Sequence, residues 1–313
     1  MRHFILSALC VLLTGCASDP GQPADPAAPL LADLHDPDGR VMVAAHRGCW
    51  SDGNAPENSV AAMQACIRLG VDIVELDLRF TSDGALVLSH DSTLKRMAGV
   101  DRKIADLTLA EVQSHPLRNH DGRSDGDGFT TQHLASFREM LQASGRHVLI
   151  IMDLKDDPAK VAPAAARILR EEGDCDIAMF ALPLAPDEVE PAVGPLLSCA
   201  AFLPNLRVPM GPMSTVARSY AKLDPVAVAV RFDDWSYLYE GADAVAAMPA
   251  RLWVNTLNPY HAGGLTDADA LTDPDALWGR LVDAGVNMIQ TDEPAALMAY
   301  LQTHKARATA PKP

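Results

Sequence analysis

The chain has 313 residues, of which 48% are hydrophobic, and a formal net charge of −15 at pH 7. This length allows one large domain or two small ones, and the composition is ordinary for a globular protein with a sizeable core. The sequence is acidic overall and contains no cluster of basic residues, which argues against nucleic acid as a partner. An anionic substrate would therefore need a local positive centre, such as a metal ion or a few arginines and lysines.

The N-terminus is typical of an exported lipoprotein. Residues 1–15 predict a signal peptide, because the apolar run Phe4–Leu13 suits a signal core and is too short to span a bilayer. The tetrapeptide Leu13-Thr14-Gly15-Cys16 resembles the bacterial lipobox, in which the cysteine is lipidated and becomes the mature N-terminus. The alternative is an ordinary secretory signal that happens to contain Cys16.

Residues 16–39 are rich in Pro, Asp and Ala and predict a flexible tether between the lipidated Cys16 and the folded body. We therefore expect a protein of the cell envelope that faces the periplasm and is held at a membrane by its lipid. Ala17, which follows the cysteine, differs from the aspartate that resembles an inner-membrane retention signal, and this favours the outer membrane.

The body, residues 40–303, alternates buried apolar runs with helical patterns and is followed by a polar tail at 304–313. Such alternation predicts an α/β fold with a parallel sheet, here a (β/α)₈ TIM-type barrel. Nine strands are expected, at 41–45, 71–80, 85–89, 147–153, 176–181, 197–202, 226–230, 252–255 and 286–290. Since a barrel needs eight, we expect either one strand of the 71–90 pair or the 226–230 strand to lie outside the wall.

Helices are expected between these strands, at 60–69, 106–112, 134–143, 158–172, 274–284 and 294–302. Asn58 is a candidate N-cap for the first of them. The polar stretch 115–131 interrupts the alternation of strands and helices. Two interpretations of it are left open, a lid over the site and a solvated insert.

Several chemically capable side chains fall at or just after the carboxyl ends of predicted strands: His46, Asp77, His90, Asp153 and Lys155. In a barrel those ends open on one face, where active sites are built. Glu75 and Asp77 are two residues apart on one strand, so both project to the same side as a pair of hard oxygen ligands for Ca²⁺ or Mg²⁺. A turn at Asp83-Gly84 would return His90 to the level of Asp77.

These residues belong to an ordered set of motifs that resembles the glycerophosphodiester phosphodiesterase family. The resemblance covers roughly residues 41–302. The matching segments are His46-Arg47-Gly48, Pro56-Glu57-Asn58-Ser59, Val74-Glu75-Leu76-Asp77, Thr81-Ser82-Asp83-Gly84, Leu88-Ser89-His90-Asp91, Asp153-Leu154-Lys155 and Gln290-Thr291-Asp292-Glu293-Pro294.

The resemblance implies hydrolysis of small glycerophosphodiesters to sn-glycerol 3-phosphate and an alcohol. It implies one divalent cation, Ca²⁺ or Mg²⁺, held by Glu75, Asp77 and Asp153. It further implies acid–base catalysis by His46 and His90, with the order of their roles open, and phosphate binding by Arg47 and Lys155.

The chain departs from the family pattern at Asp153, where the family usually has glutamate. The shorter side chain leaves open whether the third ligand acts through water or the metal lies deeper. Changes at Leu134–Met140 and Leu252–Thr256 leave the pocket for the alcohol undefined. Two alternatives therefore remain: a phospholipase D-type or sphingomyelinase D-like phosphodiesterase, and a lipid-anchored binding protein that has lost catalysis.

Four cysteines besides Cys16 remain in the mature body: Cys49, Cys66, Cys175 and Cys199. The periplasm permits disulfides, and four cysteines allow three full pairings. Cys175 and Cys199 lie near successive predicted strands, so they form the pair to test first.

Overall fold

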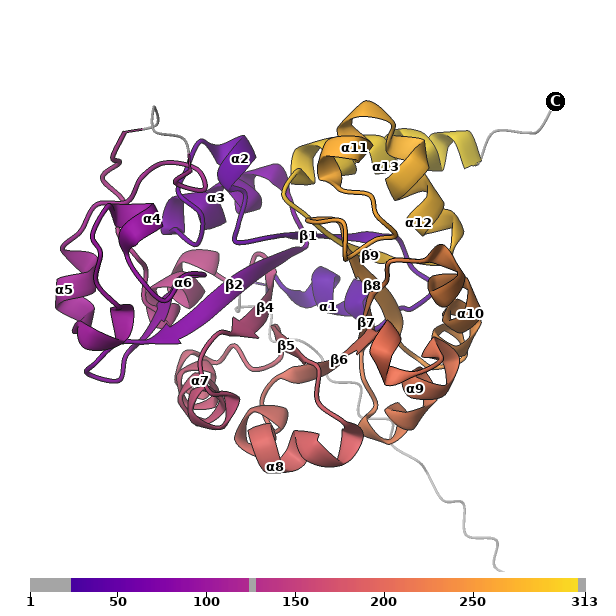
Figure 1. Ribbon diagram of the computed structural model, residues 1–313, viewed down its shortest axis with the longest axis horizontal. Coiled ribbons are helices and arrows are strands. Elements are labelled where there is room, and N and C mark those ends of the chain that lie inside the picture. The colour runs from indigo at the N-terminus through magenta and orange to yellow at the C-terminus, as the bar shows by residue number, and fades with distance from the viewer. Residues whose placement is uncertain (1–23, 124–127, 309–313) are drawn as a thin grey trace, which may run out of the picture.

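The computed structural model describes residues 24–123 and 128–308, with side chains to residue 304, as a closed eight-stranded parallel barrel (Figure 1). The strands of the wall pair in chain order, and β1 pairs with both β2 and β9, which closes the ring. They are β1 (Met42–Ala45), β2 (Ile73–Phe80), β4 (Leu149–Leu154), β5 (Ala178–Leu182), β6 (Ala201–Arg207), β7 (Ala227–Arg231), β8 (Arg251–Asn255) and β9 (Met288–Thr291). The predicted (β/α)₈ barrel is confirmed.

The ninth predicted strand is β3 (Leu86–Leu88), which pairs only with β2 and in the antiparallel sense. It lies outside the wall, whereas the 226–230 run is the barrel strand β7. The hairpin turns at Gly84, whose φ of +79° is a conformation that glycine adopts without strain. After the turn, the Ser89 amide donates a 2.9 Å hydrogen bond to the Asp77 carbonyl, so the chain does return to the level of Asp77.

Helices surround the barrel, as the ring of coiled ribbons in Figure 1 shows. They are α2 (Trp50–Gly53), α3 (Val60–Leu69), α6 (Phe137–Ser144), α7 (Pro158–Glu172), α8 (Pro186–Leu197), α9 (Met213–Ser219), α10 (Trp235–Ala246), α11 (Asp267–Thr272), the π-helical turn η4 (Asp275–Gly279), α12 (Arg280–Asp283) and α13 (Pro294–Ala308). The helices predicted at 60–69 and 158–172 match α3 and α7.

Several boundaries differ from the sequence prediction because side-chain caps decide them. Ser59, not Asn58, caps α3, since its side chain accepts a hydrogen bond from the Ala62 amide. Ser136 likewise delays the start of α6 to Phe137 through a capping box. The strand expected at 197–202 is β6, which begins at Ala201 because α8 continues to Leu197.

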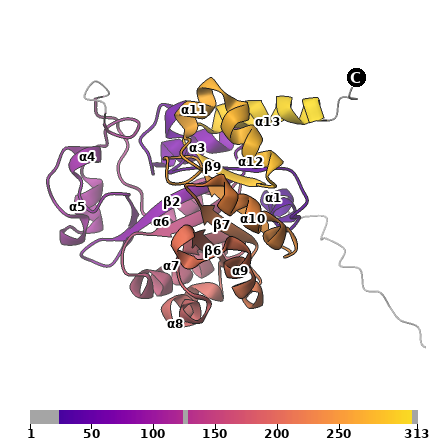
Figure 2. The same cartoon turned by 45° about the vertical axis from the view of Figure 1, so that its right-hand side comes forward.

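Residues 91–123 and 128–131 form a lobe beside β2 rather than part of the barrel wall (Figures 1 and 2). The lobe contains the short helices α4 (Lys95–Ala98), η1 (Ile104–Asp106) and α5 (Leu109–Gln113), the last of which was predicted at 106–112. It has its own small apolar cluster, formed by Val87, Leu94, Met97, Ala98, Ile104, Leu107, Val112, Leu117 and Leu134. The 115–131 stretch is therefore anchored at Leu117, and its residues 124–127 lie outside the described part.

The segment expected as a tether is partly folded. Residues 28–34 form helix α1 (Ala28–Leu34), and the buried Arg251 side chain donates hydrogen bonds to the carbonyls of Asp33, Asp36 and Arg40. Because a buried guanidinium needs acceptors, these bonds hold residues 33–40 against the amino end of the barrel. Residues 1–23, with the predicted signal peptide and Cys16, lie outside the described part.

At the other end of the chain, α13 continues through Ala308, where a polar tail was predicted from residue 304, and residues 309–313 are not described. In the part of the chain that the structure describes, no helix is long and apolar enough to cross a membrane.

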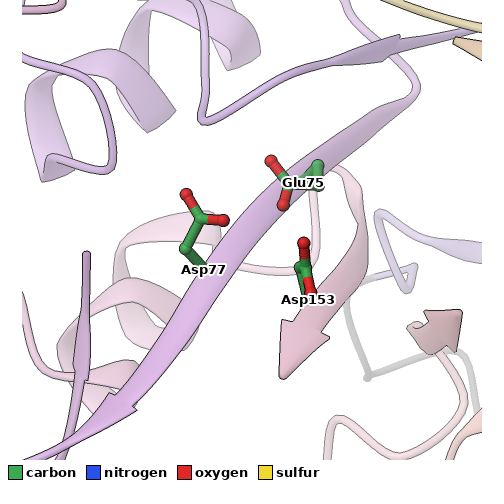
Figure 3. Close-up of side chains that lie close together, drawn as sticks. All are labelled: Glu75, Asp77 and Asp153. Atoms are coloured by element: carbon green, nitrogen blue, oxygen red, sulfur yellow. The ribbon is translucent and has the colours of Figure 1, made fainter. Parts of the chain in front are cut away.

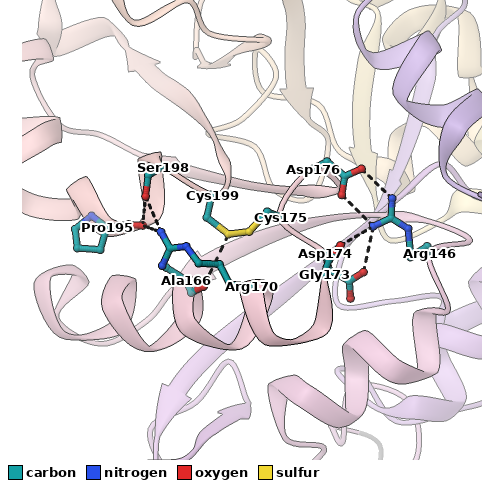
Figure 4. Close-up of a disulfide and its surroundings, with 10 residues drawn as sticks. All are labelled: Arg146, Ala166, Arg170, Gly173, Asp174, Cys175, Asp176, Pro195, Ser198 and Cys199. Carbon is teal, nitrogen blue, oxygen red and sulfur yellow. Dashed lines mark hydrogen bonds and ion pairs between the residues drawn. A yellow bond between two sulfur atoms is a disulfide. The ribbon is translucent and has the colours of Figure 1, made fainter. Parts of the chain in front are cut away.

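Two disulfides link the four body cysteines. Cys175 pairs with Cys199, as predicted, and joins the segments that enter β5 and β6 beside α7 (Figure 4). Cys49 pairs with Cys66 and joins the loop after β1 to α3. One disulfide thus lies at the amino end of the strands, and the other follows the His46-Arg47-Gly48 motif directly.

Candidate active site

The carboxyl ends of the strands surround a cavity of about 700 Å³. Among the predicted site residues, the cavity is lined by His46, Arg47, Glu75, His90, Asp153 and Lys155. Asp77 is fully buried behind them and reaches the same cluster. The structure therefore brings together all seven predicted catalytic, phosphate-binding and metal-binding residues, while Cys16 lies outside the described part.

Three carboxylates converge from two neighbouring strands, as Figure 3 shows for Glu75 and Asp77 on β2 and Asp153 on β4. Asp77 and Asp153 are direct register partners in the parallel pairing, and Glu75 precedes Asp77 by two residues on the same face. One oxygen from each of the three lies within 4.8 Å of the others. The shorter side chain at Asp153 therefore still joins the cluster.

Cations neutralise part of this negative charge. The Lys155 ammonium lies 3.0 Å from Asp77 Oδ1 and 2.6 Å from Asp153 Oδ2, and the Arg47 guanidinium lies 3.2 Å from Asp77 Oδ2. Burial by itself would raise the pKa of Asp77, but Lys155 and Arg47 outweigh burial and lower it. Asn58 adds a 2.7 Å hydrogen bond to Asp77 Oδ2, so Asn58 supports a site carboxylate instead of capping a helix.

Glu75 shows the opposite behaviour. Burial, followed by the charges of Asp77 and Asp153, raises the pKa of Glu75 well above its usual range. A divalent cation fits here, because its charge would displace that proton and its preferred ligands are oxygens of this kind. The arrangement could hold Ca²⁺ or Mg²⁺ through these three carboxylates.

His46 is oriented by the carboxylate of Asp292. Its Nδ1 lies 2.8 Å from Asp292 Oδ1, at the end of β9, and its Nε2 lies 4.0 Å from Glu75 Oε2. The contact joins residues 246 positions apart. The only sequence signal for it was the motif Gln290 to Pro294, from which hydrogen-bonding support and substrate contact were both open for Asp292.

The backbone after His46 turns sharply so that Arg47 faces the carboxylates. Arg47 has a φ of +57°, and its amide donates a 3.0 Å hydrogen bond to Glu75 Oε2. Gly48 follows with a φ of +85°, and a Cβ there would lie 2.9 Å from the Ala62 side chain. Glycine is therefore required both by conformation and by the close approach of α3.

His90 is held by a relay of charged groups. Its Nδ1 lies 2.9 Å from Asp91 Oδ1, and Asp91 accepts a 2.8 Å hydrogen bond from Arg96, which also pairs with Glu57 at 2.6 Å. Glu57 in turn pairs with Arg47, so the relay returns to the carboxylate cluster. Burial lowers the pKa of His90, although Asp91 partly offsets this, and His90 is therefore mainly neutral at pH 7.

Comparisons with known proteins agree with this geometry. The model of the glycerophosphoryl diester phosphodiesterase family matches residues 46–169, and a model described as a domain of unknown function matches residues 209–301. Glycerophosphodiester phosphodiesterase 1 of Bos taurus is 36% identical over 137 residues, covering 43% of this chain and 40% of that protein. A glycerophosphodiester phosphodiesterase of Caldanaerobacter subterraneus is 32% identical over 117 residues, covering 37% and 46%. The match thus spans less than half of either relative.

Solved structures agree on the fold over most of the chain. A glycerophosphoryl diester phosphodiesterase from Parabacteroides distasonis has a TM-score of 0.65 at 17% identity, covering 88% of this chain and 90% of that one. An Oleispira antarctica phosphodiesterase in complex with its product sn-glycerol-3-phosphate has a TM-score of 0.62 at 19% identity, covering 84% and 97%. At these identities the likeness establishes the barrel fold alone. Residues 46–169 match the glycerophosphoryl diester phosphodiesterase family, which is the family that the motifs predicted.

Proposed function

We propose that this protein hydrolyses glycerophosphodiesters to sn-glycerol 3-phosphate and an alcohol, with Ca²⁺ or Mg²⁺ as its cofactor. The observation that carries the proposal is the placement of two histidines, each fixed by an aspartate, beside a cluster of three carboxylates, two of which are buried. The names of the relatives and the product bound to the Oleispira antarctica protein support the same reaction class.

In this mechanism His46 acts as the base. Asp292 accepts a hydrogen bond from Nδ1–H, which leaves Nε2 free to accept a proton from the attacking hydroxyl group. If that hydroxyl belongs to water, glycerol 3-phosphate forms directly. If it belongs to the substrate's glycerol, a cyclic phosphate forms first and water then opens it. Arg47 and Lys155 bind the phosphate oxygens, Arg47 through the planar fork of its guanidinium. A cation held by Glu75, Asp77 and Asp153 would supply positive charge that offsets the negative charge developing on the phosphate.

His90 acts as the acid that protonates the leaving alkoxide, and the Asp91–Arg96 relay keeps its ring in place. Because burial lowers the pKa of His90, the protonated form is a minority at pH 7. We expect kcat to fall as pH rises through that lowered pKa if His90 is the acid. If the roles of the two histidines are exchanged, kcat should fall instead as pH drops through it.

We also propose that Cys16 carries a lipid that holds the protein at the periplasmic face of a membrane, with the outer membrane favoured. The lipobox-like sequence supports this proposal. Metabolic labelling with a fatty acid in the native bacterium tests it, because Cys16→Ser should abolish both the label and membrane fractionation.

The reaction is tested with protein purified without residues 1–16 and assayed for release of glycerol 3-phosphate from glycerophosphocholine and glycerophosphoethanolamine. His46→Ala and His90→Ala should each lower kcat by about 10²–10⁴-fold, since that is the usual contribution of one proton transfer. His147→Ala, an exposed histidine before β4, is the matched control.

Full activity in either active-site variant, or activity that EDTA leaves unchanged, would contradict the mechanism. Intact lysophospholipids and sphingomyelin belong in the same substrate panel. Preference for them over glycerophosphodiesters would favour the phospholipase D-type alternative, and binding without turnover of any substrate would favour the inactive binding protein.

A further inference from the structure

Two arginines face the cavity from the wall opposite the carboxylates. Arg207 ends β6 and Arg231 ends β7, and the two are direct register partners in the parallel pairing. Both line the cavity, together with Asn205 and Ala229, which precede them by two residues on the same faces of their strands. Both guanidinium groups therefore belong to the inner wall of the mouth.

Neither arginine has an acidic partner. Within residues 24–123 and 128–304, no ion pair or hydrogen bond engages either guanidinium. The cavity's other cations behave differently, since Arg47 pairs with Glu57 and Lys155 pairs with Asp153. Asp153, whose charge acts on Arg231, already pairs with Lys155. These two positive charges are thus available to a ligand.

Polar atoms next to the arginines are also unsatisfied. Asn205 Oδ1 and His261 Nδ1 are buried and form no hydrogen bond with the described residues, and both side chains line the cavity. Burial, and then the charge of Arg207, lower the pKa of Arg231. An anion bound between the two guanidinium groups would relieve this repulsion.

Strand order places the arginines opposite the reaction centre. The ring runs β1, β2, β4, β5, β6, β7, β8, β9, so β7 is four strands from β2 and β6 is four strands from β1. Arg231 therefore faces the strand of Glu75 and Asp77 across the barrel, and Arg207 faces the strand that ends at His46.

We propose that Arg207 and Arg231 bind a second anionic group, carried by the alcohol half of the substrate. The proposal rests on the proposed function, in which Arg47, Lys155 and the carboxylate site hold the scissile phosphate. The glycerol half is uncharged, so an anion that reaches β6 and β7 belongs to the other half. A phosphomonoester or a carboxylate suits two adjacent guanidinium forks.

The experiment measures kcat/KM for four glycerophosphodiesters whose alcohols differ in charge. The alcohols are choline, which is cationic, glycerol, which is neutral, serine, which carries a carboxylate beside an ammonium group, and glycerol phosphate, which carries a phosphomonoester and is the anionic alcohol of the set. The wild type should prefer an anionic alcohol to choline. In the double variant Arg207→Gln/Arg231→Gln the ratio of kcat/KM for anionic over neutral alcohol should fall about 10–100-fold, mainly through KM, since charge-assisted hydrogen bonds are lost.

The matched control is Arg218→Gln, which removes an exposed arginine from the outer helix α9 and should leave that ratio unchanged. Arg207→Glu/Arg231→Glu should shift the preference toward the choline substrate. The serine and glycerol phosphate substrates distinguish a carboxylate from a phosphomonoester as the preferred anion.

An equal loss of kcat/KM for all four substrates in the double glutamine variant would overturn the proposal, because it would place the arginines on the scissile phosphate. An unchanged ratio would overturn it as well. If no diester is hydrolysed, the proposed function fails, and calorimetric binding of the glycerol phosphate diester to wild type and double glutamine variant still tests the arginines. Equal affinity for the two proteins would then overturn the inference.

Discussion

The two sides of the barrel mouth differ in how their charges are arranged. On the side of β1, β2 and β4, acids and bases are interlocked, with Asp77 between Lys155 and Arg47, and each histidine against its own aspartate. On the side of β6 and β7, Arg207 and Arg231 have no acidic partner among the described residues.

This difference separates two tasks. Charges that are paired before a ligand arrives keep the side chains in fixed positions, and catalysis needs such preorganisation. Charges without partners bind whatever complementary group the ligand brings, which suits selection among substrates.

The largest effect that we expect comes from breaking the paired side at Asp77. Asp77→Asn removes the charge that Lys155 and Arg47 share and one proposed metal ligand, and kcat/KM should fall by roughly 10³-fold, equivalent to about 4 kcal/mol. Steady-state kinetics with glycerophosphocholine, at several Mg²⁺ and Ca²⁺ concentrations, measures this.

Asp72→Asn is the matched control, because Asp72 is also buried, lies just before the same strand and pairs with Arg40 at the opposite end of the barrel. This variant should lose about 1–3 kcal/mol of stability to urea and keep the wild-type KM. If Asp77→Asn retains activity within tenfold of wild type, the paired side is not the reaction centre.

The two disulfides allow a second test of the comparison. Cys175→Ser/Cys199→Ser opens a loop of sequence separation 24 at the amino end of the strands, and the free energy of unfolding should fall by about 3 kcal/mol without a change in KM. Cys49→Ser/Cys66→Ser should lower the free energy of unfolding by a similar amount and also lower kcat/KM about 10–100-fold. The reason is that Cys49 lies two residues after Arg47, in the loop that positions the Arg47 side chain.

Urea unfolding and kinetics on both double variants check this prediction. The two variants are controls for each other, since each removes one crosslink that closes a loop of similar length. Equal kinetic constants in both would mean that the loop after β1 holds its shape without its disulfide.

The smallest effect concerns His261, which lies on the side without paired charges. Burial, and then the charges of Arg231 and His46, lower the pKa of His261 to about 4. The unfolded chain takes up this proton near pH 6.5 and the folded chain only near pH 4, so the contribution of His261 to stability is lost as pH falls between those values. The wild type should lose about 2 kcal/mol between pH 7 and pH 4.5 through this group.

Urea midpoints at the two pH values measure this loss, which should be absent in His261→Asn. His147→Asn removes an exposed histidine and should keep the wild-type pH dependence. A wild-type slope in His261→Asn would mean that His261 gains a partner when protonated, and the contrast between the two sides would then be weaker.

The sequence by itself determined the barrel, the two histidines, the carboxylate pair on β2 and the lysine after β4, because each depends on local signals. Buried strands appear in the sequence as apolar runs, and the functional groups lie at or just after the ends of those runs. The position of His90 was also predictable, since it depends on a short hairpin with glycine at the turn.

Only the tertiary structure decided which groups meet across long separations. Asp292 orients His46, Asn58 supports Asp77 and Arg251 binds the carbonyls of residues 33–40, and none of these contacts leaves a local pattern in the sequence. The same holds for Arg207 and Arg231, since only closure of the ring places them opposite the carboxylates. Local patterns specify where each strand ends, whereas the ring closure specifies which ends face each other.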